Sequence, residues 1–291
     1  MKSSNELLDL LELKTIDAGN FQGVSKTIGS PHVFGGQVLA QAVNAAYKTI
    51  TNQRILHSLH AYFLEAGDLN VPIDFSVNEV RDGGSFSTRR VLASQNGKAI
   101  FILAASFHKE ESGHDHQIEM NTSLKQPEDL LSWTEMLQQF GSVLPKITKH
   151  FLEIERPIEF KPVEVVNPLK QENLPPYSNI WFKLKTPLLN ADLATKQQIL
   201  TYISDYNILA AALLPHASKA HFGNTQMASL DHSMWFFRDF DYDDWMLYSI
   251  ETPNASSARG FAKGNIFSRD GKLIACVAQE GLMRPMVKKT E

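Results

Sequence analysis

One acidic residue lies in an apolar stretch of the chain. The segment TYISDYNILAAALL, residues 201–214, is almost wholly apolar, but Asp205 lies near its middle. A buried carboxylate without a partner is costly, so such a group is usually paired with another group, neutralised by a proton, or used in a reaction. Asp205 is therefore the first candidate for a chemical role.

Two placements of Asp205 are open. If a helix begins near Ser204, then Ser204 is its N-cap and Asp205 only favours the helix N-terminus. Against this, the segment QQILTYI at 197–203 already looks helical. Asp205 is then expected inside a helical segment or at a break in one, and the sequence favours a functional role for it.

A second polar group comes from the segment SLDHSMWFF, residues 229–237. In a strand, successive side chains alternate, so Ser229, Asp231 and Ser233 are expected on one face and His232 on the other. Such a polar row needs partners if the strand is central. Without further information, an edge strand that faces solvent explains it better.

The third group is Gln279 in LIACVAQEGLM, residues 273–283. It follows a short apolar strand and shares a face with Val277 and Ala275. A polar amide at the end of a buried face could orient a ligand or a water, but ordinary capping of a strand end explains it equally well. Cys276 is expected on the opposite face, as a small buried residue and not as a nucleophile.

Other motifs argue against metal, serine-nucleophile and phosphate-loop chemistry. The segment HSLH is expected to place His57 and His60 on opposite faces of a strand, which argues against shared metal ligation, and HDH at 114–116 is interpreted as a solvated loop. The chain has no Gly-x-Ser-x-Gly motif, and the glycines of DGGSFS at 82–87 precede a strand and not a helix. No metal and no cofactor are predicted.

Composition limits the partners and the location. The chain has 291 residues and a net charge of −4, which gives no reason to expect nucleic acid as a partner. It has no apolar run of about 18 residues, so no membrane span is predicted. A single cysteine, an acidic N-terminal segment and a C-terminus unlike Ser-Lys-Leu favour a cytoplasmic location.

Hydrophobic periodicity and turn residues predict helices and antiparallel strands. Helices are expected at 3–13 with Ser4 or Asn5 as the cap, at 34–50, at 128–140, and at 191–214, either continuous or broken in the middle. Strands are expected at 21–25, 73–80, 87–94, 99–108, 179–185, 229–237, 245–252, 259–268 and 273–283, with an edge strand at 157–166. The tripeptides NGK at 96–98 and DGK at 270–272 predict hairpin turns.

An internal duplication is indicated by two offsets. The dipeptide His-Ser recurs 175 residues apart, at 57 and 232, and the two hairpin tripeptides begin 174 residues apart. This pattern predicts an α+β fold of two helix-on-antiparallel-sheet repeats, joined edge to edge into one continuous sheet. The expected division is a first repeat at 1–110, a linker with some structure at 111–176, and a second repeat at 177–291.

Several long segments of the chain resemble one known family. The segments FGGQVLAQA, LHSLHAYFLEAGD, VRDGGSFSTRRVLASQNGKAIFILAASF, SDYNILAAALLPH, SLDHSMWFF and YSIETPNASSARGFAKGNIFSRDGKLIACVAQEGLMR are similar to those of the acyl-CoA thioesterase II family, the TesB type. The resemblance covers roughly 30–110 and 155–285. It implies a double hotdog fold, hydrolysis of fatty acyl-CoA to free acid and coenzyme A without a metal, and a homo-oligomer, either a dimer or a tetramer.

The resemblance also implies a catalytic trio. By motif, the family's Asp, Ser or Thr, and Gln fall on Asp205, Ser229 and Gln279, and His60 in LHAYF is a candidate for a supporting role. Asp205 would then act as a general base or water-orienting carboxylate, and Ser229 and Gln279 would hold the same water. Direct attack by Asp205, giving a mixed anhydride, is the mechanistic alternative.

The resemblance leaves further questions open. With the offset of 174, Gln279 corresponds to Ala105, so the first repeat is expected to lack a trio of its own. Basic residues at corresponding points of the repeats could meet coenzyme A phosphates, although a solvated strand face is at least as good an explanation; they are Arg89, Arg90, Arg259 and Lys263. The rival functions are an enoyl-thioester hydratase or dehydratase, and a non-catalytic acyl-CoA binding protein.

Overall fold

The computed structural model describes residues 1–51, 53–165, 167, 170 and 172–286. In the first half, the elements are α1 (Ser4–Leu11), β1 (Lys14–Asp17), β2 (Asn20–Gly23), α2 (Gly35–Tyr47), β3 (Arg54–Phe63), β4 (Ile73–Asp82), β5 (Phe86–Gln95) and β6 (Lys98–Lys109). The middle of the chain contains a 3-10 turn (Pro127–Asp129), α3 (Trp133–Phe140), α4 (Lys146–Glu153) and β7 (Ile158–Pro162).

The second half repeats the order of the first. Its elements are β8 (Tyr177–Leu184), α5 (Leu193–Ser204), α6 (Ile208–Ala211), a 3-10 turn (Leu214–His216), β9 (Thr225–Ser229), β10 (Asp231–Phe236), β11 (Met246–Ser256), β12 (Arg259–Ser268) and β13 (Leu273–Pro285). In each half a strand and a helical segment are followed by antiparallel strands, as the internal duplication predicts.

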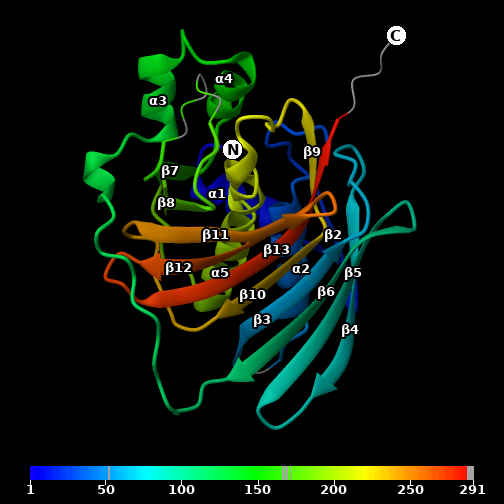
Figure 1. Ribbon diagram of the computed structural model, residues 1–291. Coiled ribbons are helices and arrows are strands. Elements are labelled where there is room, and N and C mark those ends of the chain that lie inside the picture. Colours follow the sequence, from blue (N-terminus) through cyan, green and yellow to red (C-terminus); the bar gives the residue numbers. More distant parts are fainter. Residues whose placement is uncertain (52, 166, 168–169, 171, 287–291) are drawn as a thin grey trace.

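All described strands belong to one antiparallel sheet. Its order is β1-β2-β4-β5-β6-β3-β10-β13-β12-β11-β8-β7, and β9 lies end to end with β10 beside β13. The halves meet where β3 pairs with β10, with His60 opposite Ser233, and Figure 1 shows these two strands side by side at the centre of the sheet. The predicted continuous sheet of two repeats and the edge position of β7 are both confirmed.

The hairpin turns follow from local sequence. Asn96 and Gly97 adopt positive φ values of 50° and 77°, the conformation that a two-residue turn between β5 and β6 requires. Gly271 has a φ of 89° in the turn between β12 and β13. Both turns lie where the tripeptides NGK and DGK predict them.

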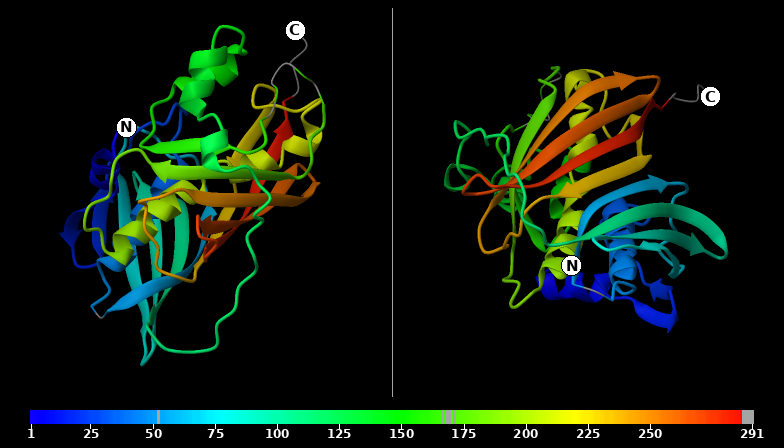
Figure 2. Two further views of the ribbon diagram at one scale, coloured as in Figure 1. Left: turned by 90° about the vertical axis from the view of Figure 1, so that its left-hand side faces the viewer. Right: turned by 90° about the horizontal axis from the view of Figure 1, so that it is seen from below.

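The two long helices share one core against the inner face of the sheet. α2 and α5 pack on each other, and Figure 2 shows the sheet curving around them. Their contact includes polar bonds as well as apolar packing: Asn44 Nδ2 donates to Gln198 Oε1 at 2.9 Å, and Tyr47 hydrogen-bonds Gln197. Because buried residues of both halves form a single apolar cluster, the repeats share one core and do not fold around two separate ones.

At the N-terminus, the predicted helix cap is one residue too late. The side chain of Ser3 accepts the hydrogen bond from Glu6 N and caps α1, where Ser4 or Asn5 was expected. Ser4 is instead buried, and its Oγ donates to Thr186 O at 2.7 Å. A distant tertiary contact therefore decides between neighbouring polar residues that local sequence cannot separate.

The predicted break in the segment 191–214 is confirmed. α5 ends at Ser204, and α6 begins after Asn207, whose φ of 68° is left-handed. A left-handed residue is uncommon outside glycine, although Asn tolerates it best, and it turns the chain sharply between the helices. Asp205 lies on the outside of this turn, at the C-cap of α5.

Paired glycines let α6 approach the sheet closely. Gly260 of β12 is opposite Gly281 of β13, and α6 packs against both strands. A Cβ on Gly281 would lie 2.4 Å from Leu209 Cδ2, and a Cβ on Gly260 would lie 2.7 Å from Ala212 Cβ. These two glycines therefore fix the depth at which the broken helical segment lies on the sheet.

Part of the segment between the two halves covers the outer face of the sheet. Met120, Leu124 and Leu130 pack on the outer face of the second half, against Trp181, Trp245 and other residues of one small apolar cluster. Trp181 Nε1 also donates a hydrogen bond to Lys125 O at 3.0 Å, which holds this segment against the sheet. Within the predicted helix at 128–140, only residues 133–140 are α-helical, after the 3-10 turn.

Gly281→Ala is expected to lower the free energy of unfolding by about 1–3 kcal/mol, the usual cost of overpacking a close-packed contact. The added Cβ meets both the Leu209 side chain and, at 3.0 Å, the Ala228 carbonyl oxygen. Chemical denaturation measures the change. Leu209→Ala in the same background should recover part of the loss, and Gly84→Ala is the matched control, because a Cβ there has no neighbour within 4 Å. A Gly281→Ala loss no larger than that of Gly84→Ala would contradict the packing argument.

Candidate active site

Asp205 is held by a backbone donor from the other half of the molecule. The N–H of Gly36, in the first turn of α2, donates to Asp205 Oδ2 at 2.8 Å. A negative charge at the C-terminal end of its own helix α5 is unfavourable, whereas a helix N-terminus stabilises an anion. The contact is close because residue 35 is glycine: a Cβ there would lie 2.7 Å from Asp205 Oδ2. The N-terminus of α2 therefore offsets the unfavourable interaction between the Asp205 charge and the C-terminal end of α5.

The structure brings Asp205, Ser229 and Gln279 together. Gln279 Nε2 donates to Ser229 Oγ at 2.9 Å, and Ser229 Oγ lies 3.5 Å from Asp205 Oδ1. Gln279 also lies close enough to the Asp205 carboxyl group to lower its pKa. Gln279 is fully buried, while Asp205 and Ser229 are partly exposed.

The predicted polar row on the strand at 229–237 is wrong. Asp231 Oδ1 accepts a bond from Glu280 N at 2.7 Å, and Ser233 Oγ lies 3.0 Å from His60 Nδ1 on the outer face, whereas Ser229 faces inward. The reason is a bulge: Ser229 pairs with Gly281 and Ser233 with Ala278, so the strand gains one residue relative to β13. The extra residue places Ser229 and His232 on the same side.

His232 is the site residue that the sequence did not reveal. Its side chain is completely buried, with Nδ1 2.5 Å from Gln279 Oε1 and Nε2 2.9 Å from Ser204 Oγ. The expected alternation assigned it to the face opposite Ser229. The repeated His-Ser dipeptide could not have found it, because the equivalent His57 lies on the outer side of β3.

The electrostatics of the site follow from desolvation. Burial, which removes water from the carboxylate, raises the pKa of Asp205 to about 7, although polar contacts with Gln279, Gly36 and Ser229 lower it. Burial lowers the pKa of His232 to about 4, so the imidazole is neutral near pH 7. Burial also raises the pKa of Tyr202, Tyr206 and Tyr248 above the usual tyrosine range, which leaves these phenols neutral.

His60 does not lie with the other three residues. It is exposed on the outer face of β3, where its ring contacts Trp235 edge-on in addition to Ser233. His57 was expected on the opposite face, but its Nε2 bonds Ser106 Oγ at 2.8 Å on the same outer side, because β3 bulges at this point. Among the residues that the structure describes, no group of three or more His, Cys, Asp or Glu side chains is arranged to hold a metal.

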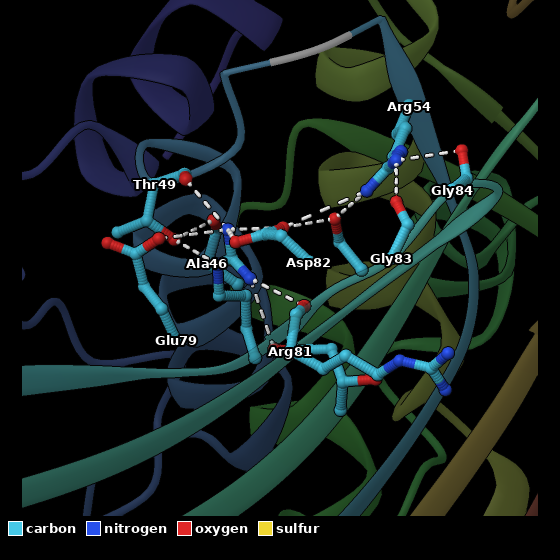
Figure 3. A network of polar contacts seen from close by, with 11 residues as sticks. Ala46, Thr49, Arg54, Glu79, Arg81, Asp82, Gly83 and Gly84 are labelled. Carbon is cyan, nitrogen blue, oxygen red and sulfur yellow. Dashed lines mark hydrogen bonds and ion pairs between the residues drawn. The ribbon is translucent and has the colours of Figure 1, made fainter.

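The first half has a different network at the corresponding place. Gln279 is opposite Ala262 in the second half, whereas Ala105 is opposite Arg89 in the first. The Arg89 side chain is 1% exposed and bonds Asp82, Glu79 and Thr49 at 2.9–3.1 Å. Figure 3 shows Thr49, Glu79 and Asp82 gathered here, beside Arg54.

Arg89 therefore meets neither expectation made for it. It is not a coenzyme A phosphate ligand reaching into solvent, and it is not a residue of a solvated strand face, because its guanidinium is buried and paired. Of the other three basic residues, Arg259 pairs with Glu280 and Lys263 with Glu251, and Arg90 is exposed. At the position that corresponds to Gln279, the first half has Ala105, beside the ion-pair network of Arg89.

Cys276 is half-buried and faces away from Gln279, as expected. Its Sγ lies 2.9 Å from Asn265 Oδ1 on the neighbouring strand β12, and burial raises the pKa of the thiol. Because the thiolate is the nucleophilic form, a raised pKa disfavours a nucleophilic role at neutral pH. The candidate chemistry is thus confined to the oxygen and nitrogen groups around Asp205.

Comparison with known proteins connects both halves to one family. The profile described as "Acyl-CoA thioesterase N-terminal domain" matches residues 23–108, and "Acyl-CoA thioesterase" matches residues 147–282. The chain is 42% identical to acyl-CoA thioesterase 2 of Haemophilus influenzae, over 96% of this chain and 97% of the relative. It is 38% identical to acyl-coenzyme A thioesterase 8 of Homo sapiens, over 97% of this chain and 90% of the relative.

Solved structures agree with the fold. The acyl-CoA thioesterase II TesB2 of Mycobacterium marinum superposes with a TM-score of 0.78 at 34% identity, over 95% of this chain and 97% of that one. A hot dog fold protein from Alicyclobacillus acidocaldarius gives a TM-score of 0.76 at 16% identity, over 96% and 98%. The predicted double hotdog architecture is therefore confirmed.

The protonation of Asp205 predicts a pH-dependent stability. The pKa of Asp205 is about 7 in the folded protein and has the ordinary value of 3.8 in the unfolded chain. At a pH between these two pKa values, the folded protein therefore holds a proton that the unfolded chain has released. The resulting stability is complete below the unfolded value and is lost as the pH rises through about 7. At about 1.4 kcal/mol per pKa unit, the loss between pH 5 and pH 8 is at most about 3 kcal/mol, since Asp205 keeps some access to water.

Denaturation of the wild type and Asp205→Asn at both pH values measures this effect. The asparagine variant should lose less stability than the wild type over the same interval, by up to that amount. An equal loss in both proteins would show that Asp205 does not titrate as described.

Proposed function

The chain belongs to the acyl-CoA thioesterase family, and we propose that it hydrolyses fatty acyl-CoA thioesters with a water held and activated by Asp205, Ser229 and Gln279. The observation that carries the proposal is the meeting of a hydroxyl and an amide around a carboxylate with a pKa of about 7. Family membership supports the thioester substrate, and the geometry supports the roles of the three residues.

Asp205 is suited to both proton transfers of the reaction. A group with a pKa near the working pH is partly ionised and can accept a proton and return it. The ionised carboxylate takes a proton from the water, while the water oxygen forms a bond to the thioester carbonyl carbon. When the carbon–sulfur bond breaks, the same proton can go to the coenzyme A thiolate, so atoms and charge balance over the cycle.

Ser229 and Gln279 fix the position of the water. The separation of 3.5 Å between Ser229 Oγ and Asp205 Oδ1 is the outer limit of a hydrogen bond, at which a bridging water is a better partner for both groups. Gln279 Nε2 already donates to Ser229 Oγ, which leaves the Ser229 hydroxyl hydrogen and the Asp205 oxygen directed at the same point. Holding a reactant in this way removes part of the entropic cost of the attack.

The remaining parts of the proposal concern organisation and location. We include a homo-oligomer, a dimer or a tetramer, because the outer face of the first half exposes Tyr62, Phe86 and Leu92 at 57%, 43% and 41%, while the segment 111–176 covers the second half's outer face. A sedimentation coefficient typical of a monomer would contradict this.

We also propose a cytoplasmic location, which cell fractionation tests. We propose in addition that the chain divides into 1–110, 111–176 and 177–291, which limited proteolysis tests. Among the described helices, none is long and apolar enough to cross a membrane.

Asp205→Asn is expected to lower kcat at least about a hundredfold, the lower end of a general base's usual contribution. The wild-type kcat should rise with pH through about 7, because the ionised carboxylate is the active form. Thiol release from acyl-CoA esters of increasing chain length measures both effects. Asp231→Asn is the matched control, because this carboxylate is nearby but bonds Glu280 N. Equal turnover by the wild type and Asp205→Asn would assign Asp205 a structural role.

The route of attack can be distinguished by isotope labelling. In a single turnover in water enriched in oxygen-18, the label is expected in the released fatty acid and not in the peptide that contains Asp205. Direct attack by Asp205, followed by hydrolysis of the anhydride at the aspartyl carbon, transfers label to Asp205. Mass spectrometry of the digested enzyme detects the label, and labelled peptide would exclude the direct-water route.

A further inference from the structure

His232 is a buried, neutral side chain between the candidate trio and helix α5. Its two ring nitrogens contact only side chains that can change the direction of their hydrogen bonds: Gln279 Oε1 at 2.5 Å and Ser204 Oγ at 2.9 Å. The Ser204 hydroxyl has a second acceptor, Thr201 O, at 2.8 Å. The direction of every bond in this chain therefore depends on which ring nitrogen of His232 carries the proton.

One direction of the chain suits an ionised Asp205. With the proton on Nδ1, His232 donates to Gln279 Oε1, and the Gln279 amide group then directs its N–H bonds to Ser229 and toward Asp205, whose pKa it lowers. Nε2 is left as an acceptor for the Ser204 hydroxyl. All the donors around the carboxylate then point toward it, which is the arrangement that favours the charged form.

The opposite direction suits a protonated Asp205. With the proton on Nε2, His232 donates to Ser204 Oγ, and the Ser204 hydroxyl donates to Thr201 O. Nδ1 is then an acceptor, so the Gln279 amide must rotate by half a turn and present its oxygen to Ser229 and Asp205. An amide oxygen facing a carboxylate is repelled by it, so this arrangement disfavours the ionised form.

We propose that His232, protonated on Nδ1, is a positioning residue that fixes the orientation of the Gln279 amide and so stabilises the ionised form of Asp205. The inference rests on the proposed function, because it assigns His232 to the same site. His232 does not touch the water or the thioester in this scheme. His232 acts on Asp205 indirectly, through its hydrogen bond to Gln279.

The other titratable groups around the chain do not supply this effect. Tyr202, Tyr206 and Tyr248 face Asp205 from α5, its C-terminal turn and β11, and all three phenols are neutral near pH 7 because burial raises their pKa values. Arg156 lies beyond Tyr206 and is not a hydrogen-bond partner of Asp205. Asp231 and Glu280 flank His232 and Gln279 in sequence, but Glu280 bonds Arg259 on the outer face.

Two variants of His232 separate positioning from packing. Asn at 232 can place its amide nitrogen where Nδ1 lies and keep the donor to Gln279, whereas Leu fills similar space without one. His232→Leu should move the acidic limb of the kcat–pH profile upward by about one unit, the size expected for one lost buried hydrogen bond, and so lower kcat at pH 7 about fivefold, with KM little changed. His232→Asn should stay within about threefold of the wild type, and His60→Leu, on the outer face of β3, should match the wild type.

The tautomer itself can be observed in the wild-type protein. Nitrogen-15 NMR of histidine-labelled enzyme at pH 8 distinguishes a proton on Nδ1 from one on Nε2, and comparison with His232→Asn assigns the signal among the ten histidines. A proton on Nδ1 supports the inference, and any other state of His232 at this pH overturns it, even if His232→Leu does not fold.

The outcomes keep the inference separate from the proposed function. Loss of turnover in Asp205→Asn with an unchanged pH profile in a folded His232→Leu overturns only the positioning role. Failure of His232→Asn to rescue activity, at an unfolding temperature equal to that of the wild type, does the same. No thiol release by the wild type overturns the proposed function, while the NMR result still reports the direction of the bond chain.

Discussion

The bond between the Gly36 N–H and the Asp205 carboxylate is the contact on which the site depends. Asp205 lies at the C-terminal end of α5, where the helix dipole disfavours a negative charge, and its surroundings exclude most of the solvent. The N-terminus of α2, from the other half of the chain, provides the opposing field. The site therefore cannot form from the second half alone, although that half provides Asp205, Ser229, Gln279 and His232.

The duplication has been used asymmetrically, and the exchange of small and large residues shows how. At one cross-strand position the second half has Ala262 beside Gln279, whose amide bonds the Ser229 hydroxyl. At the corresponding position the first half has Arg89 beside Ala105, and the guanidinium fills the space and binds the acids around it. A buried arginine without Asp82 and Glu79 would be costly, so these residues are required together. The second half provides the candidate site residues, and the first half provides α2, whose Gly36 N–H holds Asp205.

The sequence predicted the elements better than it predicted which side chains meet. The two long helices, the hairpins and the break near Asp205 depend on local patterns and were found where the patterns indicated, whereas α4 was not predicted and the helix expected at 128–140 is α-helical only at 133–140. The face of Ser229 and the role of His232 depend on a one-residue bulge against β13, and a single inserted residue reverses the alternation from which faces are predicted. Ser3 as the cap and the buried state of Arg89 depend on partners far along the chain. The resemblance to a family supplied Asp205, Ser229 and Gln279, whereas His232 and Gly36 could be recognised only from the contacts.

Departures from ordinary local structure concentrate around the same few residues. Asn207 is left-handed, and its Nδ2 is buried without a hydrogen-bond partner among the described residues. Gly260 and Gly281 are needed for α6 to approach the sheet, and Gly35 is needed beside Asp205. The strand is also interrupted at Leu230. Each of these features costs stability on its own, and none is required by a helix packed on a sheet. Together they bring a partly desolvated carboxylate, a hydroxyl and an amide to one point that solvent can still reach. A fold selected only for stability would have a regular α5 and an apolar residue at 205, so the position of these costs is itself an argument that the group at 205 is used.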